Sequence, residues 1–325
     1  MPIIDTHTHL ASLEWLELLT AHGGPTYEVR PLPAGKRAIF ANGHVFALLH
    51  PDLFERDKRI DDMDEAGVDM SILSLTTPGV LWGGEEFSVR AAAVSNDCLA
   101  DAQEAHPERL RWIATLPMQY PEAAVRELDR ACANGALGVL LGANVDGVPL
   151  TDPAYAPVWQ EMDRRRLVVT VHPTLPAGAA GMRMEEYHLT AMVGFTFDTT
   201  LAVARMIYDG FFDRYPDIRF VVTHSGGTAP YLVNRLDNGY RILPHCSENI
   251  SEPPSAYLGR LYYDDAMARL DAARLCMGIC GQDRYIHGSD YPFIPYAASL
   301  KWADGAEAPL RDAVMNRNVR QLYGI

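Results

Sequence analysis

Cysteine is scarce and unpaired in this sequence. Only five of the 325 residues are cysteines, and no two of them form a Cys-x-x-Cys pair. Disulfide frameworks and thiolate zinc sites both depend on closely spaced sets of cysteines. The sequence therefore argues against a disulfide-stabilised scaffold and against a cysteine-based zinc site.

Long apolar runs and an excess of positive charge are also missing. No run approaches the roughly 18 residues of a membrane-spanning helix, and no basic segment followed by an apolar core stands at the N-terminus. With 28 Lys and Arg against 42 Asp and Glu, the net charge is −14. This charge disfavours nucleic acid or an anionic membrane as the main partner. We expect a cytoplasmic protein that binds neither a membrane nor nucleic acid.

The sequence does contain a regular alternation of short apolar strands and amphipathic helices. The first strand carries His7 and His9, and seven more are expected at 69–75, 111–116, 138–141, 167–173, 219–224, 261–264 and 285–290. The helices expected between and after them include 56–66, closed by Gly67, about 189–212, and a closing helix near 307–322. Eight strand–helix alternations favour a single α/β domain over residues 1–325, folded as a (β/α)8 TIM barrel. A doubly wound open sheet is the alternative, but no Gly-x-Gly-x-x-Gly turn follows the first strand.

One segment interrupts this alternation directly after the first strand. Residues 10–55 show no clear periodic element and carry Gly23-Gly24-Pro25 and further prolines and glycines. A connection of this length in a compact enzyme is usually functional. We interpret residues 10–55 as an insertion that serves as a lid.

Polar residues at the ends of four predicted strands indicate a metal site. In an extended strand His7 and His9 point to the same face. His172, His224 and Asp290 follow strands five, six and eight, and a barrel keeps its site at these strand ends. Imidazole and carboxylate groups that converge in this way suit a divalent metal ion.

Each of these residues also has a simpler interpretation. His172 could be a core histidine, His224 could cap the following helix, and Asp290 could be a turn residue. Their common position on one rim makes these separate explanations the weaker ones. His287 is assigned no role, because strand alternation places it on the face opposite Asp290, toward the outer helices.

Four motifs together resemble those of the amidohydrolase superfamily. They are His7-Thr8-His9, His172-Pro173, His224-Ser225-Gly226-Gly227 and Gly288-Ser289-Asp290-Tyr291-Pro292-Phe293. More narrowly, the sequence is similar to the branch typified by 2-amino-3-carboxymuconate-6-semialdehyde decarboxylase. Nearly the whole chain takes part in the resemblance, including Arg59–Asp64, Arg235–Asn238 and Pro253–Tyr257.

The resemblance implies the role of each residue. His7, His9, His172 and Asp290 would hold the metal ion, which we expect to be Zn²⁺. His224 would activate a metal-bound water as the catalytic base, and Asp290 would share in proton movement. The implied reaction is a decarboxylation. Members with two metal ions usually carry a bridging lysine at the end of strand four, and Gly138–Asn144 contains none, so a single divalent ion is expected.

The resemblance also implies residues that bind the substrate, a small unsaturated or aromatic carboxylic acid. Arg235 matches an arginine that the family supplies from the neighbouring subunit, so a homodimer is expected. Tyr187 and Phe293 match residues that lie over and beside the substrate. The family also uses an arginine in its first loop, but Asn42–Phe46 contains none. Either the substrate lacks a second carboxylate, or Lys36, Arg37 or His44 binds it.

Two other classes of function remain as alternatives. A metal-dependent hydrolase that opens a lactone, an amide or a carbon–carbon bond could use the same barrel. A barrel that has lost catalysis and only binds a ligand is disfavoured, because all five candidate residues at the strand ends are present.

Overall fold

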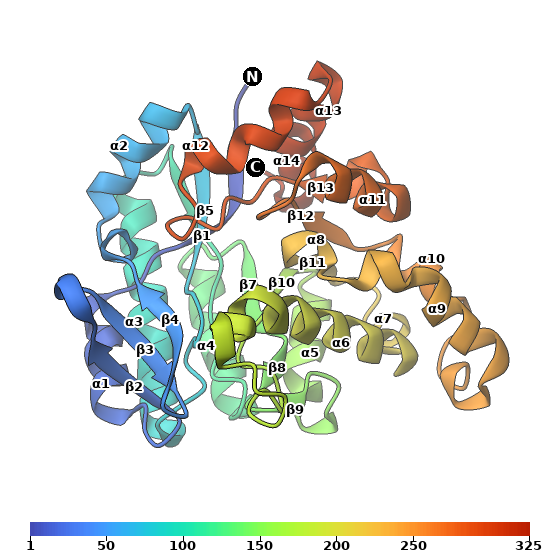
Figure 1. The fold of residues 1–325 in the computed structure, drawn as a ribbon, viewed down its shortest axis with the longest axis horizontal. Helices are drawn as coiled ribbons and strands as arrows, with labels where there is room; N and C mark the ends of the chain where they lie inside the picture. The colour runs from blue at the N-terminus through green and yellow to red at the C-terminus, as the bar shows by residue number, and fades with distance from the viewer.

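Eight parallel strands form the centre of the computed structural model, which describes residues 1–325 (Figure 1). One sheet has the order β1-β5-β6 and the other the order β13-β12-β11-β10-β7. These strands are β1 (Ile4–His9), β5 (Met70–Ser74), β6 (Leu110–Trp112), β7 (Gly138–Gly142), β10 (Val168–His172), β11 (Arg219–Val222), β12 (Tyr262–Asp264) and β13 (Tyr285–Ile286). The predicted α/β architecture is confirmed.

Each edge of the first sheet lies beside an edge of the second, β6 beside β7 and β1 beside the segment that follows β13. A parallel bridge joins Ala114, behind β6, to Val139 of β7, and another joins Thr8 of β1 to Tyr291, behind β13. The strands thus follow one another in the order of the chain, which is the order that an eight-stranded barrel requires.

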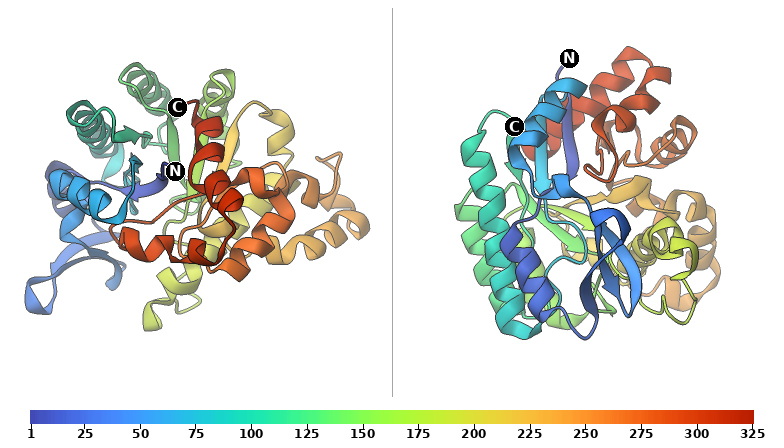
Figure 2. Two further views of the ribbon diagram at one scale, coloured as in Figure 1. Left: turned by 90° about the horizontal axis from the view of Figure 1, so that it is seen from above. Right: turned by 60° about the vertical axis from the view of Figure 1, so that its left-hand side comes forward.

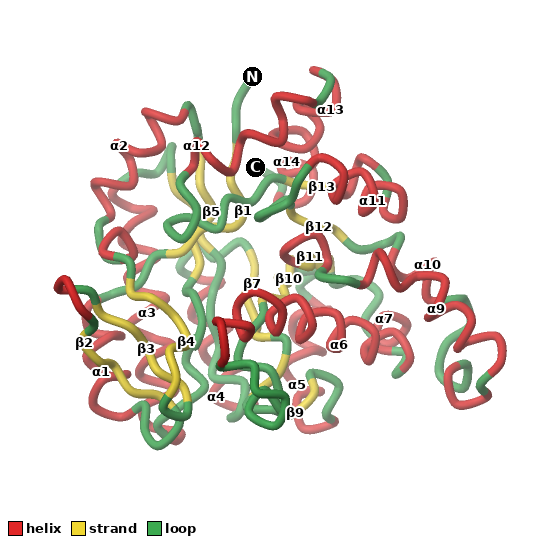
Figure 3. The backbone as a smooth tube through the Cα atoms, viewed as in Figure 1, coloured by secondary structure: helices red, strands yellow, loops and turns green.

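Helices surround these strands, as the view from above in Figure 2 and the tube in Figure 3 show. The longer ones are α2 (Arg56–Ala66), α3 (Gly84–Ala105), α4 (Pro121–Ala133), α5 (Ala156–Arg164), α6 (Phe195–Tyr208), α9 (Ala229–Ile242) and α11 (Leu270–Cys280). Both ends of α2 lie where the sequence predicts them. Gly67 closes this helix with a left-handed φ of 74°, a conformation that glycine adopts without strain.

Three predicted elements differ from the structure. The helix expected at 189–212 is divided into a π-helical turn η5 (Thr190–Gly194), α6 and α7 (Phe211–Arg214). The closing helix expected at 307–322 is likewise divided into α13 (Ala308–Asp312), η9 (Ala313–Arg317) and α14 (Asn318–Tyr323). The eighth strand ends at Ile286 rather than at Asp290, because Asp290 has a φ of 62° and cannot continue an extended strand.

The insertion after β1 is structured. It contains α1 (Leu13–His22) and an antiparallel sheet of β2 (Tyr27–Pro31), β3 (Arg37–Ala41) and β4 (His44–Leu49). These strands are short and interrupted by glycine and proline, so they leave no clear period in the sequence. Figure 1 shows this sheet in blue below α2, beside the strands of the centre.

An apolar layer lies between the eight central strands, on the side where α14 (Asn318–Tyr323) packs. Six strands each contribute one residue to it, Ile113 behind β6 adds a seventh, and α14 packs against them. The residues of this layer are Ile4, Ile72, Ile113, Leu140, Val168, Val221, Ile286, Val319, Leu322 and Tyr323. The opposite ends of the strands carry the polar residues that the sequence singles out. No helix of the structure combines the length and the apolar character needed to span a bilayer.

A buried arginine fixes the end of β1. Arg59 of α2 has no exposed surface and donates hydrogen bonds to the Thr8 hydroxyl, the His9 carbonyl oxygen and the Tyr296 hydroxyl. Its guanidinium also lies 4.7 Å from the centre of the Tyr291 ring. A single side chain thus connects α2 to β1 and to the segment behind β13.

Arg59→Ala should lower the free energy of unfolding by about 3 kcal/mol, because it leaves buried acceptors unpaired and removes a cation–π contact. Arg56→Ala is the matched control on the same helix. Arg56 is partly exposed and pairs only with Asp57, so its loss should cost about 0.5 kcal/mol or less. Urea denaturation measures both values, and equal losses would contradict the role given to Arg59.

Candidate metal centre

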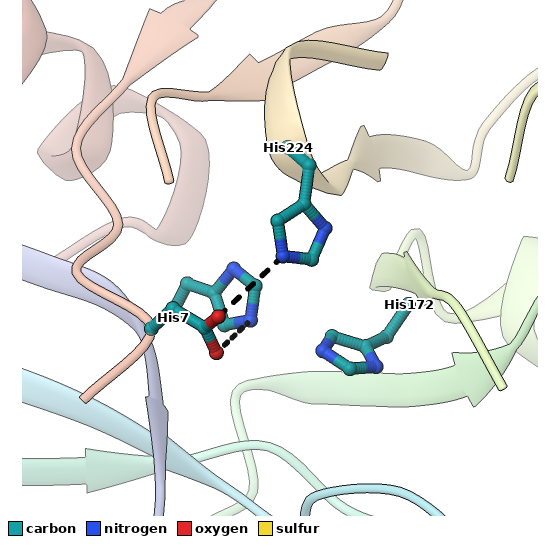
Figure 4. Close-up of side chains that lie close together, drawn as sticks. His7, His172 and His224 are labelled. Carbon is teal, nitrogen blue, oxygen red and sulfur yellow. Dashed lines mark ion pairs between the residues drawn. The ribbon is translucent and has the colours of Figure 1, made fainter. Parts of the chain in front are cut away.

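The five residues predicted at the strand ends lie together. Ligand atoms of His7, His172, His224 and Asp290 are all within 4.8 Å of one another. Figure 4 shows the imidazoles of His7, His172 and His224 turned toward a common centre, the first two from strands and His224 from the turn behind β11. The Nε2 atom of His9 lies 3.2 Å from the Nε2 atom of His7 and 3.2 Å from Oδ1 of Asp290.

The backbone brings these side chains inward in two ways. His7, His9 and His172 belong to strands β1 and β10, and the pairing of β1 with β5 is shifted between Asp5 and Thr8. His224 and Asp290 follow β11 and β13 in left-handed conformations, with φ of 54° and 62°. Residues other than glycine adopt such φ angles at a cost of about 1–3 kcal/mol, and residues strained in this way are concentrated at functional sites.

A glycine allows His7 to lie close to the end of the last strand. A Cβ atom on Gly288 would stand 2.6 Å from the Cβ atom of His7. No side chain can be accommodated at that distance without moving the histidine. The glycine of the Gly-Ser-Asp motif is therefore required by the packing of a predicted metal ligand.

Each imidazole uses its Nδ1 atom for a contact away from the centre. The partners of these four nitrogen atoms are Oδ2 of Asp264 for His7 (2.8 Å), Oγ of Ser74 for His9 (3.2 Å), the carbonyl oxygen of Pro173 for His172 (2.8 Å) and Oγ1 of Thr223 for His224 (3.1 Å). Groups that engage the outer nitrogen of a histidine orient its other nitrogen toward a metal. None of these four partners had been given a role from the sequence. Only Asp264, an acid at the end of β12 on the same rim, carried a signal that could have been used.

Two of the histidines are neutral at pH 7. Burial lowers the pKa of His9 to about 4. Burial, together with the neighbouring imidazoles, lowers the pKa of His172 well below its ordinary value. Since only a neutral imidazole has a lone pair to offer a metal, both side chains are ready to bind one.

The carboxylates of the site have the opposite effect on His7. Burial disfavours its charged form, but the neighbouring carboxylates, Asp264 first, raise the pKa of His7 to about 9. Burial also opposes ionisation of Asp290, but the neighbouring imidazoles of His224, His9 and His7 hold the pKa of Asp290 well below its usual range. Asp290 is therefore ionised at neutral pH.

The donor set fits one divalent transition-metal ion. Several Nε2 atoms and one ionised carboxylate converge, while the Nδ1 atoms are engaged elsewhere. Imidazole and carboxylate ligands suit zinc, manganese and iron, and they do not by themselves select among these metals.

Two adjoining cavities lead to this centre. The smaller, of about 30 Å³, is lined by His172 and by residues that follow β5, β6 and β7. The larger has a volume of about 240 Å³ and lies between the insertion and the loop behind β10. Its lining includes Tyr27, His44, Phe46, Asn144, Asp146 and Glu185. Both cavities are lined by Leu81 and Thr174, so they meet there.

The three residues predicted to bind substrate lie in different surroundings. Phe293 is half-buried, and its ring centre is 5.9 Å from that of His9. Tyr187 is 86% exposed and lines neither cavity. Arg235 is exposed on α9. Within one chain, the structure brings only Phe293 to the centre.

His287 lies where strand alternation predicts. Its Nδ1 atom is 3.0 Å from Asp265, whose carboxylate also accepts a hydrogen bond from Trp302 of the outer layer. This pair faces away from the centre and has no contact with the ligand atoms.

Similarity to known proteins agrees with this geometry. Residues 4–325 match a family model described as amidohydrolase. The 2-amino-3-carboxymuconate-6-semialdehyde decarboxylase of Dictyostelium discoideum is 29% identical over 89% of this chain and 81% of its own length. The gamma-resorcylate decarboxylase of Rhodococcus jostii is 30% identical over 77% of this chain and 81% of its own length.

A solved structure has the same fold. It is a 5-carboxyvanillate decarboxylase from Novosphingobium aromaticivorans with bound manganese and 3-methoxy-4-hydroxy-5-nitrobenzoic acid. Its TM-score is 0.86 at 22% identity, and the match covers 100% of this chain and 97% of that one. The resemblance inferred from the motifs is confirmed by these relatives.

The purified protein should hold about one divalent ion per chain, as expected for a single converging set of ligands. His172→Ala should remove most of it, because the ligand is lost and its site is buried. His245→Ala, at an exposed histidine of the segment Pro244–Cys246, is the control and should keep the metal. Elemental analysis measures the content, and two ions per chain in the wild type would contradict this prediction.

Proposed function

Because the chain belongs to the amidohydrolase family, we propose that it is a metal-dependent, non-oxidative decarboxylase of a small unsaturated or aromatic carboxylic acid. The observation that carries the proposal is the convergence of His7, His172, His224 and Asp290 in one buried cluster. The similar proteins named above are decarboxylases by name, which favours this reaction over others that the same centre could perform.

We place this chemistry on a single (β/α)8 barrel in which residues 10–55 act as the lid. The strand order and the two bridges between sheet edges support the barrel. The lid is supported by the larger cavity, which has Tyr27, His44 and Phe46 of the insertion on its wall. Five unpaired cysteines fit the reducing cytoplasm that we propose as the location.

In this proposal His7, His9, His172 and Asp290 hold the metal, and His224 is the catalytic base. When bound, a divalent ion supplies a Lewis acid that polarises oxygen ligands and makes a coordinated water more acidic. Zinc remains our expectation for the metal, and manganese, which is present in a protein of the same fold, is the alternative.

His224 is suited to moving protons at the centre. It is the least buried histidine of the cluster, and its Nε2 atom lies 3.6 Å from Oδ2 of Asp290. In the reaction the bond to the carboxyl carbon breaks, its electron pair remains on the neighbouring carbon, and that carbon takes up a proton as CO2 leaves. His224 takes up a proton from water and gives it to this carbon, and Asp290 stabilises the charged imidazole beside it until the transfer.

The cavities favour a substrate with a single carboxylate. Neither is lined by lysine or arginine, and the larger contains the carboxylates of Asp146 and Glu185. Lys36 and Arg37 are exposed and do not reach it, so of the three alternatives in the insertion only His44 lines the cavity. A second carboxylate on the substrate would meet like charges there, whereas hydroxyl groups would find amide and imidazole partners.

CO2 release tests the reaction. The protein loaded with zinc, or separately with manganese, is incubated with hydroxybenzoic and unsaturated monocarboxylic acids. One CO2 should form for each acid consumed. Hydrolysis of lactones or amides without CO2 release would instead support the hydrolase that the same centre allows.

We further propose a homodimer in which Arg235 serves the active site of the partner. Val193, Phe197 and Leu201 are between 41% and 51% exposed and are spaced four residues apart, so they form an apolar stripe on η5 and α6. α6 packs beside α9, which carries Arg235. A second copy of the chain that covers this stripe would also cover Tyr187 and bring Arg235 toward a substrate carboxylate.

His224→Ala should lower turnover by about 10²–10⁴, the usual contribution of a general acid–base group, while most of the metal is retained. Elemental analysis and CO2 release on the same preparation separate the two effects. An apoprotein would show that His224 is a ligand, which its place in the cluster of four also allows.

Complementation tests the shared site. His224→Ala and Arg235→Ala should each lose at least tenfold in turnover, because a buried charge-assisted contact or the base is missing. In a mixed dimer, the subunit with Arg235→Ala keeps its own His224 and receives Arg235 from its partner, so one of the two sites is complete. Activity should therefore return on co-expression. Mixed dimers that form and remain inactive would contradict a shared site.

A further inference from the structure

We propose that Asp264 is a positioning residue that sets both the tautomer of His7 and the backbone of His224. It is the last residue of β12 and is 1% exposed. The proposal rests on the metal centre of the proposed function. In the proposal, the single carboxylate of Asp264 aligns both the ligand His7, on β1, and the base His224, in the turn behind β11.

The first contact fixes His7. Oδ2 of Asp264 lies 2.8 Å from Nδ1 of His7. A carboxylate oxygen can only accept a hydrogen bond, so Nδ1 must carry the proton. When His7 gives up one proton to bind a metal, the proton on Nδ1 is kept, and the lone pair appears on Nε2, the nitrogen that faces the other members of the cluster.

The second contact fixes the turn that carries His224. Oδ1 of Asp264 accepts hydrogen bonds from the backbone N–H groups of His224 (2.7 Å) and Ala266 (3.2 Å). The carbonyl oxygen of Asp264 accepts a third, from the hydroxyl of Ser225 (3.2 Å). His224 and Ser225 both have left-handed φ values, 54° and 53°, and such a pair persists only where its surroundings hold it.

The hydrogen bonds require a carboxylate at this position. Three N–H donors, from His7, His224 and Ala266, face the two oxygens of the side chain. An asparagine has one oxygen and one NH₂ group, so it can satisfy only one side. With its oxygen toward His224, its NH₂ group would face Nδ1 of His7 and favour the tautomer protonated on Nε2. With its oxygen toward His7, the NH₂ group would oppose two backbone N–H groups.

The neighbouring Asp265 provides a matched control. It is equally buried, at 2% exposed, and accepts hydrogen bonds from Nδ1 of His287 and the backbone N–H of Gly288. It faces the outer layer and not the cluster. A variant at Asp265 therefore reproduces the structural cost of altering a buried acid, including at Gly288 beside His7, without removing a hydrogen-bond partner of His7 or of His224.

The experiment compares Asp264→Asn with Asp265→Asn, each prepared without metal and titrated with zinc against a chelator. Asp264→Asn should bind zinc about 10–100-fold more weakly than the wild type, the usual effect of losing a partner of a ligating histidine. Asp265→Asn should stay within about threefold of the wild type, even if both variants melt at lower temperature. Equal zinc affinities for Asp264→Asn and the wild type, or equal losses in the two variants, would overturn the proposal.

Ser225→Ala tests the second contact and does not depend on Asp264→Asn being folded. It removes the contacts of the Ser225 hydroxyl with the carbonyl oxygen of Asp264 (3.2 Å) and with the Tyr285 hydroxyl (2.7 Å), while the contact between Asp264 and His7 stays intact. Tyr285→Phe, which removes only the second of these contacts, is its control. In Ser225→Ala, zinc affinity should be unchanged and kcat should fall about five- to tenfold with little change in KM. An unchanged kcat, or an equal fall in Tyr285→Phe, would overturn the second part of the proposal. Because zinc affinity does not depend on the reaction, failure to release CO2 would refute the proposed function and leave the assignment of Asp264 to be judged on metal binding alone.

Discussion

The Nδ1 atom of every histidine in the cluster is engaged by a neighbour, and the site depends on this constraint. Asp264, Ser74, Thr223 and the carbonyl oxygen of Pro173 take up the outer nitrogens. The inner nitrogens must then face one another in a buried space, where only an ion or a proton makes their proximity favourable. The single carboxylate of Asp290 balances part of the charge. The cluster is thus unfavourable for packing alone, and its persistence in the fold indicates chemistry.

The sequence was most informative where local geometry determines position. The convergence of parallel strand ends was enough to predict that His7, His172 and Asp290 lie together, although Asp290 follows β13 in a left-handed conformation and does not continue the strand. The alternation of side chains along a strand placed His287 on the outer side, where it pairs with Asp265. The resemblance to a family could be stated from these residues because they are close together in the fold and at fixed places in the chain.

Other features depend on information that a single chain does not carry locally. The contact of Asp264 with His7 joins the first strand to the seventh, so it depends on strand register rather than on spacing. The strands of the insertion are short and paired with one another, and their pattern is hidden by glycine and proline. The exposed position of Tyr187 could not be anticipated, since periodicity reveals an apolar or polar face but not which molecule covers it, whereas Arg235 was expected to serve the neighbouring subunit and is exposed on its own chain. The choice between zinc and manganese likewise depends on availability and fine geometry.

The Cβ atom of His7 lies against the position of Gly288, near the other end of the chain. This proximity has a consequence for how the protein is made. A ribosome adds about 5–20 residues per second, so the strand with the first two histidines exists for on the order of tens of seconds before Asp290 is synthesised. During that time β1 can pair with β5, but the cluster lacks its carboxylate. We therefore expect the full donor set to form only after residue 290 is made, and a chain released just before that point would carry the four histidines without Asp290.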